Sequence, residues 1–381
     1  MTGVLGQVDA QDLRRSAEEL CGVAAGFSAQ HERDNRLAPE LVEQLRASGL
    51  MRSGAPAAIG GAEAPPAVAL SCAETIAAGD AATGWCVSIA MTTSLLSAYL
   101  PSDGAVETLG DPGAIAAGVW APRATARRVD GGLVVSGRWA FCSGITHADH
   151  FFGGCMLDDG DGPTMRVVGM PTSELRVIDT WHTSGLRGTG SHDAVAEDVF
   201  VPDRRTASLA DSPLDAPLYR FPIFGYFALC IAAVALGNAR GAITDLLDLA
   251  GHKKSLGARR TLAEKSSTQA AVAQAEASLR AARALFYSAI DDAWAAAKEG
   301  AVNVELRAGL RLAATHAART SADVARAMYD LGGGTAIYDE SPLQRRFRDA
   351  STITAHIQVS QGIWETTGKL LLGLPADVAQ L

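Results

Sequence analysis

The residues that could carry out chemistry are few in this sequence, and they form no metal-binding or nucleophile motif. Six cysteines are scattered without a CxxC pair, so we expect buried, reduced thiols and no zinc site. His147, Asp149 and His150 have ligand-type side chains, but no second cluster accompanies them, and we expect no metal there. Two candidates for reactivity remain. Ser143 ends a predicted strand, and His356 carries an imidazole that titrates near neutral pH.

Composition and charge exclude several classes of partner. The chain has 381 residues and a net charge of −9, which disfavours binding to nucleic acid or to an anionic membrane. Hydrophobic residues make up 48% of it and charged residues 20%, as in globular proteins. No secretory signal is recognisable, and the longest apolar run, Tyr226–Leu236, is shorter than the roughly 20 residues of a membrane span. We therefore expect a soluble, cytoplasmic protein.

The elements that must position Ser143 and His356 fall into three zones: residues 1–111, 112–215 and 216–381. The first zone is predicted to be helical, and the second is a small β domain. Along its strands, alternation places Trp139 and Phe141 on one face. The predicted helices of the first zone are Val8–Phe27, Pro39–Ser48 and buried segments within Ala67–Leu100. The predicted strands are Ala124–Val129 and Leu133–Trp139, joined as a hairpin, then Thr164–Met170 and Ala194–Val201.

The third zone has the pattern of long helices, which predicts a four-helix bundle. The first of them should end at Gly251, a favourable residue just past a helix. The last should be capped by Ser341, begin with Pro342 and continue past His356 to Gly373, so that Thr352, Ile353, Val359 and Ser360 surround the imidazole. The other helical ranges are Phe224–Leu249, Leu262–Lys298 and Val304–Leu331. The fold class is α+β, mostly α.

This order of zones resembles the acyl-CoA dehydrogenase superfamily over essentially the whole chain. Three local matches carry the resemblance: Trp139–Gly144; Gly185–Ser191 followed by Val199–Pro202; and Leu331–Thr335 leading to Arg348–Ala350. The resemblance implies an N-terminal helical domain, a central small β-barrel or sandwich domain and a C-terminal four-helix bundle.

The catalytic base of the dehydrogenases is missing. They remove a weakly acidic proton beside a thioester, which requires a positioned carboxylate. Ile357 stands where the common members have Glu, and the stretch Tyr226–Ile231, which matches the alternative location, has no acid. The chain instead resembles the two-component flavin-dependent monooxygenases of this fold, through Phe141–Gly144 and through Pro342–Arg345 leading to His356.

That resemblance implies reduced flavin (FADH2 or FMNH2) and O2 as cofactors, with a separate NAD(P)H:flavin reductase as a transient partner. Ser143 and His356 are expected to donate hydrogen bonds to a C4a-hydroperoxyflavin in a dry pocket. The other implied flavin-binding residues are Trp120, Phe141, Cys142, Gly144, Thr189, Ser191, Arg260, Gln269, Gly333 and Gly334. The Gly333–Gly334 loop is expected to reach the flavin of a neighbouring subunit, in a homotetramer.

We expect the substrate to be an aromatic or polycyclic small molecule, because the candidate lining residues are apolar and aromatic. These residues are Trp85, Met91, Phe224, Tyr226 and Phe227. Oxidation of nitrogen in an amino sugar or of sulfur in a heterocycle remains an alternative on the same fold. So do an acyl-CoA dehydrogenase with a relocated base and a flavin-free scaffold.

Overall fold

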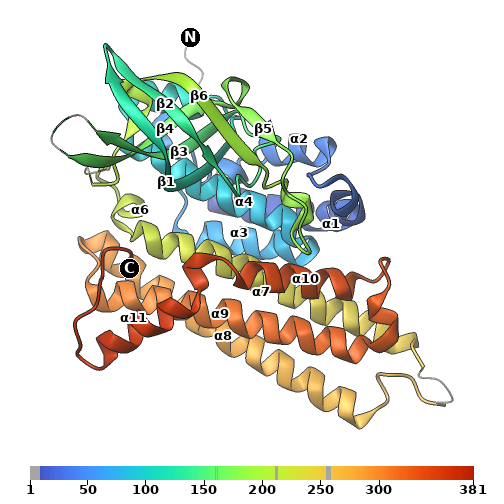
Figure 1. Ribbon diagram of the computed structural model, residues 1–381. Helices are drawn as coiled ribbons and strands as arrows, with labels where there is room; N and C mark the ends of the chain where they lie inside the picture. The colour runs from blue at the N-terminus through green and yellow to red at the C-terminus, as the bar shows by residue number, and fades with distance from the viewer. Residues whose placement is uncertain (1–8, 159, 161, 211–212, 255–258) are drawn as a thin grey trace.

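The protein is described from a computed structural model, which covers residues 9–158, 160, 162–210, 213–254 and 259–381. It has a β-sheet layer, a middle layer of buried helices and a layer of long C-terminal helices (Figure 1). The helices α3 (Pro66–Gly79) and α4 (Ala81–Ser94) lie between the sheet and the long helices. A side chain on the middle layer can therefore contact both outer layers.

The N-terminal part is helical. Asp9 caps α1 (Ala10–Asp34) by accepting hydrogen bonds from the backbone N–H groups of Gln11 and Asp12. Val8, with which the predicted helix begins, lies outside the described residues. The remaining helices of this part are α2 (Pro39–Ala47) and α5 (Ser102–Leu109), with short 3-10 turns between the helices.

The β domain is one seven-stranded mixed sheet in the order β5-β6-β2-β1-β3-β4-β7. The hairpin forms as predicted, because Gly131 adopts the positive φ of 72° that its tight turn requires. Strand β1 also pairs with β3 in parallel, with a register shift between Val119 and Ala124. The strands are β1 (Ala116–Val129), β2 (Gly132–Trp139), β3 (His150–Asp158), β4 (Pro163–Pro171), β5 (Arg176–Ile178), β6 (Asp193–Pro202) and β7 (Thr206–Ala207).

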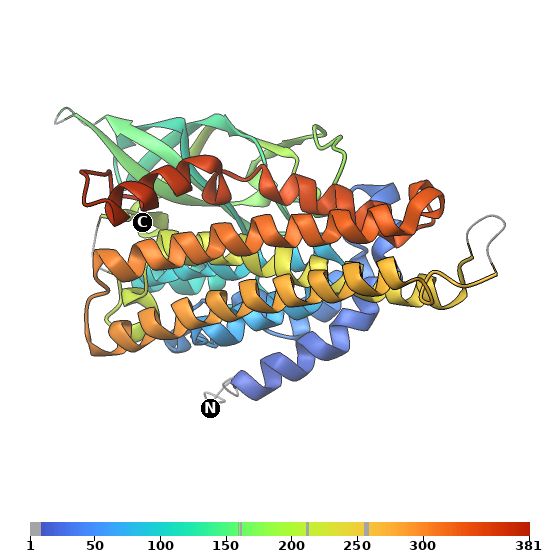
Figure 2. The same ribbon diagram turned by 90° about the horizontal axis from the view of Figure 1, so that it is seen from below.

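The C-terminal part contains three long helices and a fourth, interrupted one. After the short α6 (Pro217–Arg220) come α7 (Ile223–His252), α8 (Ser266–Glu299) and α9 (Val304–Gly332). Helices α10 (Pro342–Thr354) and α11 (Gln361–Leu371) then run end to end beside α9 (Figure 2).

Several sequence predictions about helix ends are wrong. Helix α1 runs to Asp34 rather than to Phe27, and α8 begins at Ser266 rather than at Leu262. Helix α7 continues past Gly251 to His252. Ser341 precedes α10, but its side chain makes no capping hydrogen bond. The predicted last helix breaks between Thr354 and Gln361, where a 3-10 turn, Ile357–Val359, begins directly after His356.

Helix α7 is the centre of the core. It is rich in Ala and Gly and packs against α3, α4, α8, α9 and α10. It and Ala81–Tyr99 are long and apolar enough to cross a membrane, but 78% and 94% of their most apolar windows are buried inside the protein. Burial in the core accounts for their hydrophobicity.

Candidate functional site

Trp85 brings Ser143 and His356 together, although the three residues come from different parts of the chain. Trp85 lies on α4, and its indole Nε1 donates a hydrogen bond to Ser143 Oγ at 2.9 Å. The same indole meets the His356 imidazole edge to face, with ring centroids 5.7 Å apart and an angle of 68° between the planes. Trp85 and Ser143 are buried. The sequence predicted both reactive candidates and placed Trp85 only among substrate contacts.

Two further hydroxyl groups continue from Ser143. Ser143 Oγ lies 2.7 Å from Ser191 Oγ, which lies 2.6 Å from Thr189 Oγ1. Thr189 Oγ1 in turn donates to the carbonyl oxygen of Leu186 at 2.8 Å. These residues are buried, and we call the row Ser143–Ser191–Thr189 the hydroxyl chain.

His356 lies in the break between α10 and α11, with extended backbone angles, rather than on a helix face. Its Nδ1 accepts a hydrogen bond from the backbone N–H of Gln358 at 3.3 Å, so the neutral ring carries its proton on Nε2. Among the described residues, Nε2 has no hydrogen-bond partner. Burial, with a smaller effect of the Arg311 charge, lowers the pKa of His356 to about 4. The imidazole is therefore a neutral donor at pH 7.

Arginines on α9 hold the turn that carries His356. Arg319 donates to the carbonyl oxygens of Thr354 at 3.2 Å and Val359 at 3.1 Å, on either side of the histidine. Arg311 donates to the carbonyl of Gln358 at 3.3 Å and also to that of Gln380. The Thr354 carbonyl is one that the end of α10 leaves unpaired. Sequence reasoning missed both arginines; their signal is a charged residue on the bundle-facing side of α9.

Phe141 is exposed beside Ser143. Its side chain is 70% exposed, its φ is +66°, and its ring lies edge to face against Trp181. Trp139, two residues earlier, is completely buried, so the prediction that both share one face is wrong. The strand ends at Trp139, and the left-handed conformation at Phe141 turns the chain outward. Trp181, which donates from Nε1 to the Leu186 carbonyl at 2.9 Å, was not predicted.

Cys142 and Gly144 shape this turn through their backbones. The N–H of Cys142 donates to the His192 carbonyl, and that of Gly144, whose φ is +77°, donates to the Thr189 carbonyl. Burial raises the pKa of the Cys142 thiol to about 12, which keeps it protonated.

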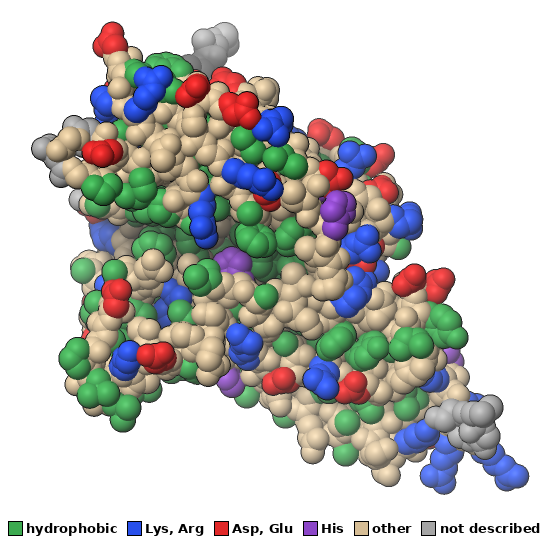
Figure 3. All heavy atoms as spheres, viewed as in Figure 1, with side chains coloured by type: hydrophobic (Ala, Val, Ile, Leu, Met, Phe, Trp, Pro, Cys, Tyr) green, Lys and Arg blue, Asp and Glu red, His purple; other side chains and the backbone are tan. Residues whose placement is uncertain are grey.

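Aromatic residues form part of an apolar wall between the sheet and the helices. The Trp120 ring is buried, and its centroid lies 4.1 Å from that of the Phe227 ring. The centroids of the Phe227 and Phe224 rings are 6.3 Å apart. Figure 3 shows a hollow between the β domain and the C-terminal helices, with hydrophobic side chains along it and a histidine at its edge. Met91 and Tyr226 are fully buried in the core, and the Tyr226 ring packs against Phe221.

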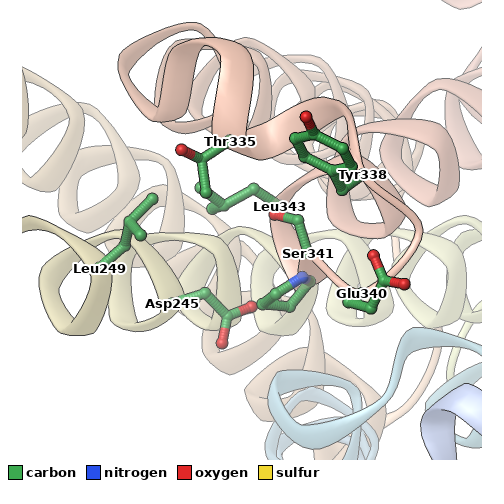
Figure 4. Close-up of a pocket in the computed structure, with 8 residues that line it drawn as sticks. Asp245, Leu249, Thr335, Tyr338, Glu340, Ser341 and Leu343 are labelled. Atoms are coloured by element: carbon green, nitrogen blue, oxygen red, sulfur yellow. The ribbon is translucent and has the colours of Figure 1, made fainter. Parts of the chain in front are cut away.

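Four predicted flavin-binding residues lie together at another end of the molecule. Arg260, Gln269, Gly333 and Gly334 are exposed there. Lys253, just after α7, connects α7 to the end of α9 there by donating a hydrogen bond to the Gly332 carbonyl. A pocket of about 380 Å³ lies beside it (Figure 4), lined by Asp245, Leu249, Thr335, Tyr338, Glu340, Ser341, Pro342 and Leu343. The whole of α10, 13 residues or about 20 Å, separates Ser341 from the turn of His356.

Of the residues considered for metal binding, Asp149 has structural partners, whereas His147 Nδ1 and His150 Nδ1 have none among the described residues. Asp149 accepts hydrogen bonds from Arg46 and from the backbone N–H of Ile115. Burial lowers the pKa of His147 to about 4, and His150 begins β3. No group of three or more potential metal ligands occurs in the part of the chain that the structure describes.

With this geometry established, comparison with known proteins identifies the fold class. Profiles of the acyl-CoA dehydrogenase N-terminal and C-terminal domains match residues 8–105 and 229–361. The structure of XiaF from a Streptomyces species, in complex with FADH2 and glycerol, superposes with a TM-score of 0.90 at 27% identity, covering 98% of each chain.

Two curated relatives show to which branch of this fold class the chain belongs. Indole-3-acetate monooxygenase of Pseudomonas putida is 36% identical over 348 residues, which are 90% of this chain and 89% of the relative. The oxygenase component of FADH2-dependent resorcinol hydroxylase from a Rhizobium species is 28% identical, covering 94% of this chain and 93% of the relative. The chain therefore belongs to the acyl-CoA dehydrogenase family, in its branch of flavin-dependent monooxygenase oxygenase components.

Proposed function

We propose that this protein hydroxylates an aromatic small molecule at the hollow beside Trp85, Ser143 and His356. The observation that carries the proposal is the meeting of two polar groups, one hydroxyl and one neutral imidazole, through a single buried indole. Among the described residues, the only charged group that shifts the pKa of His356 is Arg311, a cation. Within the described part of the chain, no carboxylate acts on the His356 pKa, which disfavours the dehydrogenase reaction.

The residues around Ser143 fit a reduced flavin. Ser143 has a lone pair to spare, His356 has an unused N–H, and the exposed Phe141 offers an aromatic surface. When bound, reduced flavin supplies the electrons with which O2 is activated. Ser143 would hold the N5 edge of the flavin, His356 would donate a hydrogen bond from Nε2 toward the oxygen-bearing side, and the apolar wall would exclude water. The names of the relatives support an indolic or phenolic substrate.

The partners follow from this chemistry. A separate NAD(P)H:flavin reductase delivers the reduced flavin. The resorcinol hydroxylase relative supports this partner, because it is named an oxygenase component. We also propose a homotetramer. Exposed leucines gather at and just after the end of α11, and the Gly333–Gly334 loop lies about one helix length from His356, too far to reach a flavin in its own subunit. The six cysteines are all unpaired, in keeping with a cytoplasmic location.

The test is an assay with NADH, a flavin reductase, FAD or FMN, and 18O2. Indole, indole-3-acetate and resorcinol are offered in turn, and hydroxylated product and hydrogen peroxide are both measured. We expect 18O-labelled product from at least one aromatic, only when the reductase is present. Reduction of an artificial acceptor by acyl-CoA, without labelled product from any aromatic, would contradict the proposal.

Two variants test whether the activity depends on His356. His356→Ala removes the neutral donor, so product per flavin oxidised should fall about tenfold or more while hydrogen peroxide rises. His252→Ala, at the exposed end of α7, is the matched control and should resemble the wild type.

A further inference from the structure

Each hydroxyl of the hydroxyl chain donates its hydrogen bond in the same direction, from Ser143 toward Thr189. Thr189, at the inner end, sets that direction. Thr189 has one hydroxyl hydrogen and donates it to the Leu186 carbonyl, which cannot donate in return. The 2.6 Å contact with Ser191 must then be made with the hydrogen of Ser191. By the same reasoning, the 2.7 Å contact between Ser191 and Ser143 uses the hydrogen of Ser143.

Trp85 fixes the other side of Ser143. An indole N–H can only donate, so Ser143 Oγ accepts from Trp85 at 2.9 Å. The hydroxyl of Ser143 therefore donates inward and accepts from the indole. What it has left to offer a ligand is one lone pair and no hydrogen. From the sequence we expect a hydrogen-bond donor at Ser143, whereas the hydroxyl chain leaves an acceptor there.

The nitrogen N5 of a flavin changes its hydrogen-bonding character with redox state: it carries a hydrogen in the reduced form and is a bare acceptor in the oxidised form. We infer that Thr189 and Ser191 are positioning residues that make the site select reduced over oxidised flavin, by presenting Ser143 to N5 as an acceptor. The inference rests on the proposed function, in which Ser143 lies against N5.

Selection of this kind suits an enzyme whose flavin arrives reduced and leaves oxidised. Reversing the chain would turn the Ser143 hydrogen outward, toward an oxidised N5, but would take the Thr189 hydrogen away from the Leu186 carbonyl. The buried chain therefore loses one hydrogen bond in the reversed state. One net hydrogen bond corresponds to a factor of about five to ten in an equilibrium constant.

The experiment measures the dissociation constants of oxidised and of reduced FAD anaerobically, in the wild type and in Thr189→Val. Valine keeps the shape of threonine and removes the acceptor that Ser191 uses, so Ser191 turns to Ser143 and the Ser143 hydrogen points outward. We expect the ratio of the oxidised to the reduced constant to fall about five- to tenfold. Ser191→Ala frees the same hydrogen by a second route, and its ratio should fall likewise. Thr189→Ser keeps the hydroxyl and should restore the wild-type ratio.

A flavin analogue makes the readout specific. Oxidised 5-deaza-FAD has a C–H in place of N5 and cannot accept a hydrogen bond, so its affinity should not increase in Thr189→Val. Flavin binding by the wild type with an unchanged ratio in both Thr189→Val and Ser191→Ala would overturn the inference and leave the function standing. Equal gains for FAD and 5-deaza-FAD would also overturn it. A wild type that binds neither form of FAD would overturn the proposed function itself.

Discussion

At the scale of single residues, the site depends on buried polar groups whose protonation is set by their surroundings. His356 is neutral because charging it in place would require stripping water from the cation. Asp349 illustrates the same effect for an acid. Its Oδ1 accepts from the backbone N–H of Leu186 at 2.6 Å, which ties α10 to the loop whose carbonyl orients Thr189.

Asp349 gives a prediction about stability and pH. Burial raises its pKa from 3.8 to about 7, so between these values the unfolded chain loses a proton that the folded protein keeps. The contribution of Asp349 to stability therefore falls as pH rises from about 4 to 7. Asp349→Asn keeps an acceptor for Leu186 and removes the titration. We expect its free energy of unfolding to exceed that of the wild type by about 2 kcal/mol at pH 8 and to approach it only near pH 4.

Urea unfolding at several pH values measures this difference. Asp330→Asn is the control, because Asp330 is exposed and its ion pair with Arg326 on α9 is weak. A difference between Asp349→Asn and the wild type that did not change with pH would contradict the assignment of the raised pKa.

At the scale of elements, the break between α10 and α11 determines where His356 lies. Arg319 bonds to a carbonyl on each side of the histidine, so we expect Arg319→Leu to loosen the turn. Product formed per flavin oxidised should fall about tenfold, since small displacements of a reacting group are costly. Arg326→Leu, on the exposed side of the same helix, is the matched control.

The measurement is the ratio of product to hydrogen peroxide, together with the melting temperature. A loss of coupling in Arg319→Leu while the protein remains folded at the assay temperature supports the role of the turn. Equal coupling in Arg319→Leu and Arg326→Leu would show that the turn holds its shape without this anchor.

The same break marks the limit of prediction from sequence. Nothing within residues 350–361 signals it: there is no proline, and Gly362 comes after the next helix has begun. Its carbonyls are bonded by arginines more than 30 residues away in the chain, and such partners are visible only once the helices are packed. The hairpin of β1 and β2, by contrast, could be predicted, because Asp130-Gly131 is a local turn signal. The parallel pairing of β1 with β3 is non-local and was not foreseen.

The candidate site, too, could be predicted only in part from the sequence. Ser143 and His356 were found because short motifs around them resemble a family. Their connection through Trp85 depends on a helix 58 residues before Ser143. The reversed orientation of Phe141 depends on one left-handed residue.

At the scale of the whole molecule, three exposed leucines at and after the end of α11 support the proposal that copies of the chain meet there. Leu371, Leu372 and Leu374 are 79%, 75% and 51% exposed. Large neighbouring apolar side chains of this kind are typical of interaction surfaces. Replacing Leu371 and Leu372 with Glu should place charges in the interface and yield smaller particles in light scattering. Val106→Glu, at an exposed apolar side chain on α5, should leave the mass unchanged. A wild type that is monomeric at micromolar concentration would contradict the proposed tetramer.

Helix α7 has a consequence for how the protein loses its structure. It lies against α3 and α4 on one side and against α8, α9 and α10 on others. A Cβ on Gly237 would lie 2.1 Å from the Glu74 carbonyl oxygen, and one on Gly241 would lie 2.5 Å from that of Ala78, so α7 and α3 touch backbone to backbone. The N-terminal helices and the C-terminal helices therefore bury α7 together. Detaching either group would expose apolar surface of α7 that the other group cannot cover. Denaturation should be a single cooperative transition rather than a sequence of domain events, and fragments cut between the zones should not fold alone.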